Sequence, residues 1–408
     1  MQPKNLANSF AEITFKKFNS LPKTGKPTKS EWTVLSSIIQ VDNSQNGETK
    51  VVALGCGTKC IGKSKLCPFG LILNDSHAEV LARRGFLRYI YHQLKSRNDL
   101  ITYDETKYVF RIKGSISFHF FTTQVPCGDA CIASEPIENC NEIPNKRIKL
   151  DDNKSNAGDV LNSSKVFTGA KLIGNHESDP MNQVQGSLRT KPGRGDRTLS
   201  MSCSDKLSKW NILGVQGALL DMILEKPIYL ESLNFSCQFD MNSMQRAIYG
   251  RWKEREFKSN RFIAQEPQIH FSEKCSFEFS QDPKKNASPN GLVWCDVPED
   301  NGPYEISVNG KKQGITKKLL QTKKASLKIS KLQLLEEFCE FVKSHSELKT
   351  KFILGEDDLE SKTYRELKEM SQEYQDSWKV LKESYFQQWT KRPDNILDFN
   401  LLSCNKNS

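Results

Sequence analysis

A histidine, a glutamate and two distant cysteines have the residue types of a zinc centre that activates water. His77 and Glu79 stand two residues apart, and Cys127 follows Pro126 further along the chain. A neutral imidazole and two thiolates can hold Zn²⁺ and leave a fourth position open for water. The metal brings the pKa of that water near neutral, so hydroxide becomes available as a nucleophile. A carboxylate that is not a ligand must then move the protons.

The spacing is typical of zinc nucleobase deaminases except at the third ligand. Those enzymes have Pro-Cys-x-x-Cys, but here Ala130 takes the second cysteine position and Cys131 comes one residue too late. Cys203 offers a replacement, because it directly precedes a predicted helix, as His77 and Cys127 also do. A helix N-terminus stabilises a thiolate over a thiol. Three helix starts that converged on one point would form such a site, with Cys131 as the alternative ligand.

Purely structural roles are also open for these residues. Ser76-x-x-Glu79 matches a capping box, in which the glutamate bonds back to the backbone. Cysteine is commonly buried as a small apolar residue. Residues two apart do not face the same way within a helix, so the catalytic interpretation needs His77 and Glu79 in an irregular first turn. A Pro-Cys pair after a strand favours the metal.

The elements around these residues alternate between strand and helix, which predicts an α/β fold. Two strands are expected within 32–55, and a buried strand within 115–127 that ends at Pro126. Helices are expected within 1–30 and over 74–94, 204–224, 331–345 and 364–389. Residues 138–200 are polar and aperiodic, which predicts an insertion or a mobile loop. Within it, 144–152 (PNKRIKLDD) is a candidate nuclear import signal.

Composition limits the possible classes of protein. The formal net charge of +10 over 408 residues favours an anionic partner such as nucleic acid. No apolar run is long enough to span a membrane, and the N-terminus lacks the apolar segment of a secretory signal. We therefore expect a nuclear or cytoplasmic protein that is not secreted, with its twelve cysteines reduced. Neither a membrane nor an obligatory protein partner is indicated.

Three segments resemble the adenosine-to-inosine RNA deaminase domain: NDSHAEVLARR, PCGDA, and MSCSDKLSKWN with the following GVQGALL. This family includes enzymes that edit double-stranded RNA and enzymes specific for tRNA, and the likeness runs from about Phe10 to Phe399. It implies a three-layer, cytidine-deaminase-like α/β core with a mixed sheet, helices on both faces and additional C-terminal helices. Residues 1–408 would form one deaminase domain, with the insertion at about 138–200.

The resemblance implies a role for each candidate residue. The zinc ligands would be His77, Cys127 and Cys203, because the third ligand comes from the later Ser-Cys-Ser segment. Glu79 would be the proton shuttle. Thr58 and Lys59 match positions that face RNA in the editing enzymes.

The family also buries inositol hexakisphosphate, a polyanion that compensates cations in a dry site. The matching positions here are Asn74, Arg83, Arg84, Lys206, Trp210, Lys331, Tyr364, Lys368, Tyr374, Gln375 and Trp389. A solvated face is the alternative for each lysine and arginine. Several positions depart from the family pattern: Lys209 replaces an arginine, Ala218 a serine, Trp378 a lysine, and Cys131 the arginine of some editing enzymes. Lysine lacks the bidentate fork of arginine.

Within the family, the tRNA branch is the more similar. No separate duplex-RNA-binding domain precedes the deaminase region, and 172–190 has no clear counterpart of the glutamate that fills the vacated base position in duplex editing. The first observation favours the tRNA enzymes, and the second favours a loop substrate, in which little unpairing is needed. The expected reaction is zinc-dependent hydrolytic deamination of adenosine to inosine, 3′ of the anticodon in alanine tRNA.

Two alternatives remain at this point. One is deamination of adenosine in double-stranded RNA, and the other is a non-catalytic, zinc-containing RNA-binding subunit. Glu79 argues for catalysis, because a subunit without activity needs the ligands but not the shuttle. The lysine-rich run from Lys311 to Lys331 could follow RNA phosphates or form a solvated charged segment.

Overall fold

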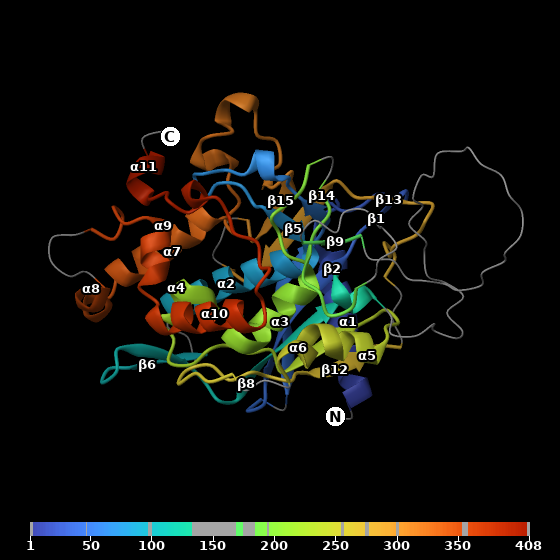
Figure 1. Cartoon of the computed structure of the whole chain (residues 1–408), viewed down its shortest axis with the longest axis horizontal. Coiled ribbons are helices and arrows are strands. Elements are labelled where there is room, and N and C mark those ends of the chain that lie inside the picture. The colour runs from blue at the N-terminus through green and yellow to red at the C-terminus, as the bar shows by residue number, and fades with distance from the viewer. Residues whose placement is uncertain are drawn as a thin grey trace, which may run out of the picture.

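The computed structural model describes residues 3–45, 47–96, 100–132, 169–173, 184–193, 196–253, 257–273, 277–298, 302–352 and 358–405. Within them the centre of the molecule is a mixed sheet of eight strands (Figure 1). From edge to edge the strands are β12 (Gln268–Phe271), β11 (Ser232–Phe235), β8 (Ile116–Thr122), β2 (Leu35–Asp42), β3 (Glu48–Cys56), β14 (Asn290–Cys295), β15 (Tyr304–Val308) and β16 (Lys311–Lys312). The first three are parallel to one another, and the remaining neighbours are antiparallel. The predicted α/β class is therefore confirmed.

The remaining described strands form short two-stranded pairs: β1 (Glu31–Trp32) with β13 (Asn286–Ala287), β4 (Thr58–Cys60) with β5 (Asp75–His77), β6 (Ile101–Asp104) with β7 (Val109–Ile112), and β9 (Lys171–Leu172) with β10 (Arg189–Thr190). The described α-helices are α1 (Pro3–Ser20), α2 (Ala78–Ser96), α3 (Cys203–Leu213), α4 (Gly217–Asp221), α5 (Met241–Gln245), α6 (Arg251–Lys253), α7 (Lys331–Lys343), α8 (Ser346–Phe352), α9 (Tyr364–Glu369), α10 (Gln372–Ser384) and α11 (Leu401–Asn405).

Helices cover both faces of the sheet. Successive residues of a strand point to opposite faces, and Ala53 and Leu54 of β3 belong to different hydrophobic clusters. The Ala53 cluster includes Phe86 of α2, whereas the Leu54 cluster includes Phe10 of α1. The sheet therefore lies between α1 and α2 in three layers. A closer likeness to cytidine deaminases stays a prediction.

Two of the predicted helices are wrong in extent. The range 204–224 forms α3 and α4, because Gly214 has a φ of 72° and ends the first helix. The range 364–389 forms α9 and α10, which ends at Ser384. The C-terminal helices (orange to red in Figure 1) lie along one side of the molecule, where α7 packs on α2 and α10 on α3.

Most of the predicted insertion lies outside the described residues, as does the candidate import signal at 144–152. The described parts of 138–200 are 169–173, 184–193 and 196–200, and within them Lys191 is only 1% exposed. The extent of the domain and the mobility of the insertion stay predictions. Among the described helices, none has the length and apolar character needed to cross a membrane.

Candidate active site

The three predicted zinc ligands converge. The Nδ1 atom of His77 lies 3.9 Å from the Cys127 sulfur and 3.7 Å from the Cys203 sulfur. All three ligand atoms lie within 4.8 Å of one another, and no other group of three His, Cys, Asp or Glu residues in the described chain could hold a metal. Tetrahedral zinc with nitrogen and sulfur ligands requires separations of about 3.5–3.8 Å. This donor set fits Zn²⁺.

His77 and Glu79 stand on either side of a junction between strand and helix. His77 ends β5, opposite Thr58 of β4, and Ala78 begins α2. The sequence interpretation required this irregular geometry. Glu79 is 3% exposed, and its Oε2 atom has no hydrogen-bond partner among the described residues. A buried carboxylate with one unpartnered oxygen is available for proton transfer.

Cys203 is the first residue of α3, and its backbone N–H donates to the Cys127 sulfur at 3.3 Å. The side chain of Ser202 caps this helix by accepting from the Asp205 N–H. Cys127 precedes only a three-residue 3-10 turn (Asp129–Cys131), so the prediction of a third helix start is wrong. A hydrogen bond from the Cys203 thiol holds the pKa of Cys127 well below its ordinary value, and burial raises that of Cys203. Zinc binding displaces such a retained proton.

Cys131, the alternative ligand, points elsewhere. Its thiol lies 3.3 Å from the carbonyl oxygen of Pro126 and 3.8 Å from that of Val125. Burial raises its pKa, which disfavours the thiolate that a metal needs. Cys203, and not Cys131, is therefore the cysteine that lies with His77 and Cys127 in the group that could hold a metal.

A buried ion pair supports the strand that carries His77. Lys191 donates to both carboxylate oxygens of Asp75, at 3.0 and 2.7 Å. Asp75 also accepts the His77 backbone N–H at 3.0 Å and forms an ion pair with Lys206. Sequence reasoning missed Lys191, because it falls in the polar range assigned to the insertion.

Two aspartates hold the cysteine segments in place. Asp129 and Asp205 each follow a ligand by two residues, and both are fully buried. Arg246 donates to the Asp129 carboxylate at 3.0 Å, and Arg251 forms an ion pair with Asp205 while lying 3.8 Å from Asp129. Arg251 thereby links the two segments that supply the sulfurs. The spacing Cys-x-Asp, present twice, is the sequence signal that could have identified them.

A second cluster consists of buried cations that form no ion pair with another described residue. Polar atoms of Arg83, Arg84 and Lys331 are closed off from solvent and have no hydrogen-bond partner among the described residues. Burial lowers the pKa of Arg84 to about 10 and that of Lys331 well below its ordinary value. Sequence reasoning noted Lys209 only as a departure from the family pattern and did not include Arg392, although both belong electrostatically to this cluster. A bound anion is one way in which such buried cations can be compensated.

Aromatic rings complete the cluster. The Lys209 ammonium lies 3.6 Å from the ring centre of Trp378 and 5.5 Å from that of Trp389. Other predicted positions lie in the same region: the Arg83 guanidinium is 5.2 Å from the Trp210 ring, Lys368 is 5.5 Å from the Tyr364 ring, Lys209 is 5.8 Å from the Tyr374 ring, and Gln375 donates to the Lys368 carbonyl at 2.7 Å. Both amide atoms of Asn74 are buried and unpartnered. Lys206 instead faces Asp75.

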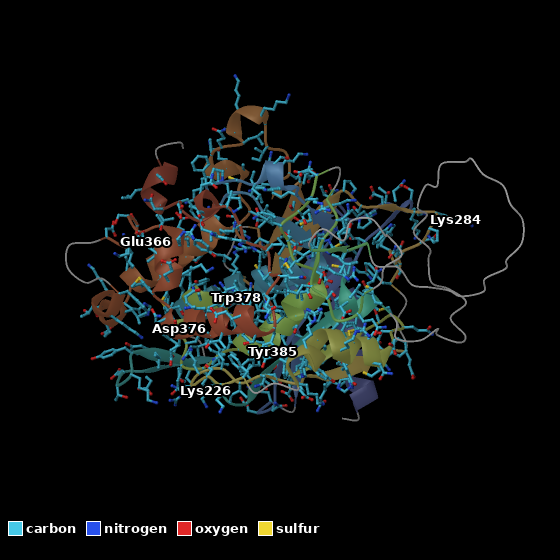
Figure 2. All side chains as sticks on the ribbon, in the orientation of Figure 1. Lys226, Lys284, Glu366, Asp376, Trp378 and Tyr385 are labelled. Carbon is cyan, nitrogen blue, oxygen red and sulfur yellow. The ribbon has the colours of Figure 1, made fainter. Side chains whose placement is uncertain are left out.

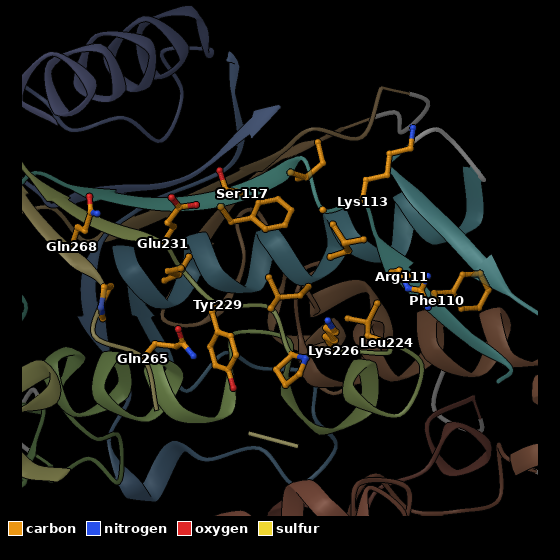
Figure 3. A pocket seen from close by; sticks show the side chains of 18 of the residues that line it. Phe110, Arg111, Lys113, Ser117, Leu224, Lys226, Tyr229, Glu231, Gln265 and Gln268 are labelled. Atoms are coloured by element: carbon orange, nitrogen blue, oxygen red, sulfur yellow. The ribbon is translucent and has the colours of Figure 1, made fainter. Parts of the chain in front are cut away.

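The pocket in Figure 3 lies away from these groups, at the start of β8. It has a volume of about 520 Å³ and is lined by Phe118, Lys226 and Tyr229, among others. None of the predicted site residues is among those that line it.

Comparison with known proteins agrees with this site. The family model of the adenosine-deaminase (editase) domain matches residues 53–393. The chain belongs to this family. It is 50% identical to tRNA-specific adenosine deaminase 1 of Drosophila melanogaster over 98% of both chains. It is 32% identical to the Homo sapiens protein of that name, over 96% of this chain and 99% of the relative.

A more partial likeness exists to the duplex-RNA branch. The double-stranded RNA-specific editase Adar of Drosophila melanogaster is 34% identical over 61% of this chain and 36% of its own length. The part of this chain that matches the editase family model includes His77, Cys127 and Cys203. As a member of the family, the chain is an adenosine deaminase.

Proposed function

We propose that this protein is a zinc-dependent hydrolytic deaminase that converts adenosine to inosine in tRNA. The adenosine 3′ of the anticodon in alanine tRNA is the expected target. The observation that carries the proposal is the buried Glu79 carboxylate, whose Oε2 atom has no described partner, beside the group of His77, Cys127 and Cys203. The names and nearly full coverage of the tRNA-specific relatives support the choice of RNA.

Zn²⁺ held by the three ligands would lower the pKa of a water molecule to near neutral. Glu79 takes one proton of the attacking water and delivers it to N1 of the adenine as the C6–O bond forms. The carboxylate then takes the remaining proton of the added hydroxyl and delivers it to the amine, which leaves as ammonia when the C6–N bond breaks and the C6 carbonyl of inosine forms. The adenine must be turned out of its stack to enter the site, and an unpaired loop base makes this less costly.

Thr58 and Lys59 are proposed to contact the RNA beside the target nucleotide. Both belong to β4, which pairs with the strand that ends at His77. The Oγ1 atom of Thr58 is buried without a hydrogen-bond partner among the described residues. The pairing of Thr58 with His77 and this unpartnered hydroxyl support the proposed contact.

We also infer that inositol hexakisphosphate occupies the cation cluster. The unpartnered atoms of Arg83, Arg84 and Lys331 support this, since bound phosphate oxygens would satisfy them. Lys209, Lys368 and Arg392 would contribute further charge. The role is structural: the polyanion compensates cations beneath α2 and α3, the helices that begin at the zinc site.

The function is tested by incubating the purified protein with total tRNA and sequencing for A-to-G changes. We expect one dominant change next to the anticodon of alanine tRNA. A parallel reaction with perfectly paired RNA tests the second candidate function, which is deamination of adenosine in double-stranded RNA. The likeness to the duplex editase supports this candidate. Inosine in the duplex alone would overturn the proposal, and inosine in neither would favour a non-catalytic subunit.

A further inference from the structure

The segment 311–324, named the basic lobe here, carries six lysines and no acidic residue. It contains the edge strand β16 and two 3-10 turns, η4 (Lys317–Leu319) and η5 (Lys323–Ala325, which extends one residue beyond it). In Figure 1 it projects in orange at the top of the molecule. The lysine-rich run from Lys311 to Lys331 therefore has two parts. Lys331 is buried in the cation cluster, whereas the basic lobe extends outward.

The positive charge of the basic lobe is not neutralised by its neighbours. Lys317, Lys318 and Lys324 are exposed, and none forms an ion pair with another described residue. Lys323 differs, because it pairs with Glu336 of α7. Uncompensated charges of one sign repel one another and attract a polyanion.

The base of the basic lobe is fixed to the segment that leads into the zinc site. Leu327 and Ile329, which follow the lobe, pack in a buried cluster with Leu73. The carbonyl oxygen of Gly310, at the turn before the lobe, accepts the Leu73 N–H at 2.9 Å. That segment continues into β5, which ends at His77. The lobe therefore keeps a defined position relative to the reacting base.

We propose that the basic lobe binds backbone phosphates of the tRNA substrate outside the anticodon arm. This inference rests on the proposed function, because it assigns the lobe to the RNA whose adenosine enters the site. Lysine ammonium groups are point charges that bind phosphates without reading sequence. A folded tRNA presents such phosphates on its other arms, which an isolated anticodon stem-loop lacks.

The test is the double variant Lys317→Glu/Lys318→Glu, assayed on full-length tRNA and on the anticodon stem-loop. For full-length tRNA we expect KM to rise about tenfold with kcat unchanged, and the slope of log KM against log salt to fall by about 2, one for each phosphate contact. For the stem-loop we expect no change. The matched control is Lys226→Glu/Lys379→Glu, which reverses two exposed charges elsewhere. Lys226 lies at the bottom of Figure 2, opposite the lobe.

The outcomes separate the two proposals. If the unmodified protein forms no inosine in tRNA, the proposed function fails, and direct tRNA binding by the same variants still tests the lobe. If the unmodified protein is active but the variant keeps its KM and salt slope, the inference about the lobe is wrong. An equal loss on the stem-loop, or in the control variant, would also overturn it.

Discussion

The Lys191 ammonium lies 2.7 Å from the nearer Asp75 carboxylate oxygen, and both side chains are almost fully buried. Asp75 simultaneously accepts the backbone N–H of His77. A lysine from one part of the chain thus stabilises the strand end that presents a zinc ligand. Nearly full burial makes each charge dependent on the other.

Asp75→Asn is expected to destabilise the protein strongly. The change leaves the buried Lys191 ammonium without its main partner, at a cost of about 3–5 kcal/mol. Urea denaturation of the two proteins measures this difference. Asp75→Asn/Lys191→Met should recover part of the loss, and an additive loss in the double variant would contradict the pairing.

Cys203→Ala is expected to abolish zinc binding. Two remaining protein ligands hold the metal far more weakly than three. The zinc content found by metal analysis should therefore fall from about one per chain to near zero. Cys131→Ala is the matched control, because its thiol faces backbone carbonyls, and it should retain the metal. The reverse pattern would make Cys131 the ligand.

Glu79→Gln is expected to lose inosine formation by a factor of about 10²–10⁴ or more, because the amide cannot move protons. The zinc content and the affinity for tRNA should remain, since the residue is neither a ligand nor, by this proposal, a source of RNA affinity. Single-turnover assays with saturating enzyme separate the chemical step from binding. Full activity in this variant would remove Glu79 from the mechanism.

The cation cluster should release inositol hexakisphosphate when the protein is denatured, which mass spectrometry can detect. Lys331→Met/Lys368→Met should lose most of it, because two of the charges that would face the polyanion are removed. Lys349→Met/Lys379→Met changes two exposed lysines on α8 and α10 and should retain it. Absence of the polyanion from the unmodified protein would refute this assignment.

His119 is expected to make the fold sensitive to acid. Burial lowers its pKa to about 4, and the neighbouring His270 acts in the same direction. In the unfolded chain His119 binds a proton below about pH 6.5, whereas in the folded chain it does so only below about pH 4. The free energy of unfolding therefore rises with pH between these two values, and the contribution of His119 is fully present above them. The loss between pH 7 and pH 4 is about 3 kcal/mol.

The measurement is urea denaturation at pH 7 and pH 4.5. His119→Gln can keep hydrogen bonds to Ser117 and Ser232 but does not titrate, so its stability should fall less over this range. Parallel falls in both proteins would assign the acid sensitivity to other groups.

The local chemistry of the site could be predicted from sequence. His77 and Glu79 are near neighbours at a helix start, and a Pro-Cys pair follows a strand, so residue type and short-range spacing identify them. The strands β2, β3 and β8 were equally predictable, because runs of β-branched and aromatic residues define them. The ends of helices were harder to predict than the strands. The pattern of apolar residues continues through Gly214, where a positive φ ends the helix.

Tertiary structure alone decided which groups meet. Spacing along the chain left Cys131 and Cys203 both possible, and the direction of each thiol distinguishes them. Lys191 falls in a polar range with no periodic signal, yet it is buried against Asp75. Arg392 has no signal in the sequence analysis, yet it acts electrostatically on the buried Lys331. Sequence determines what each side chain can do chemically, whereas its partners depend on contacts between distant segments, which spacing along the chain does not encode.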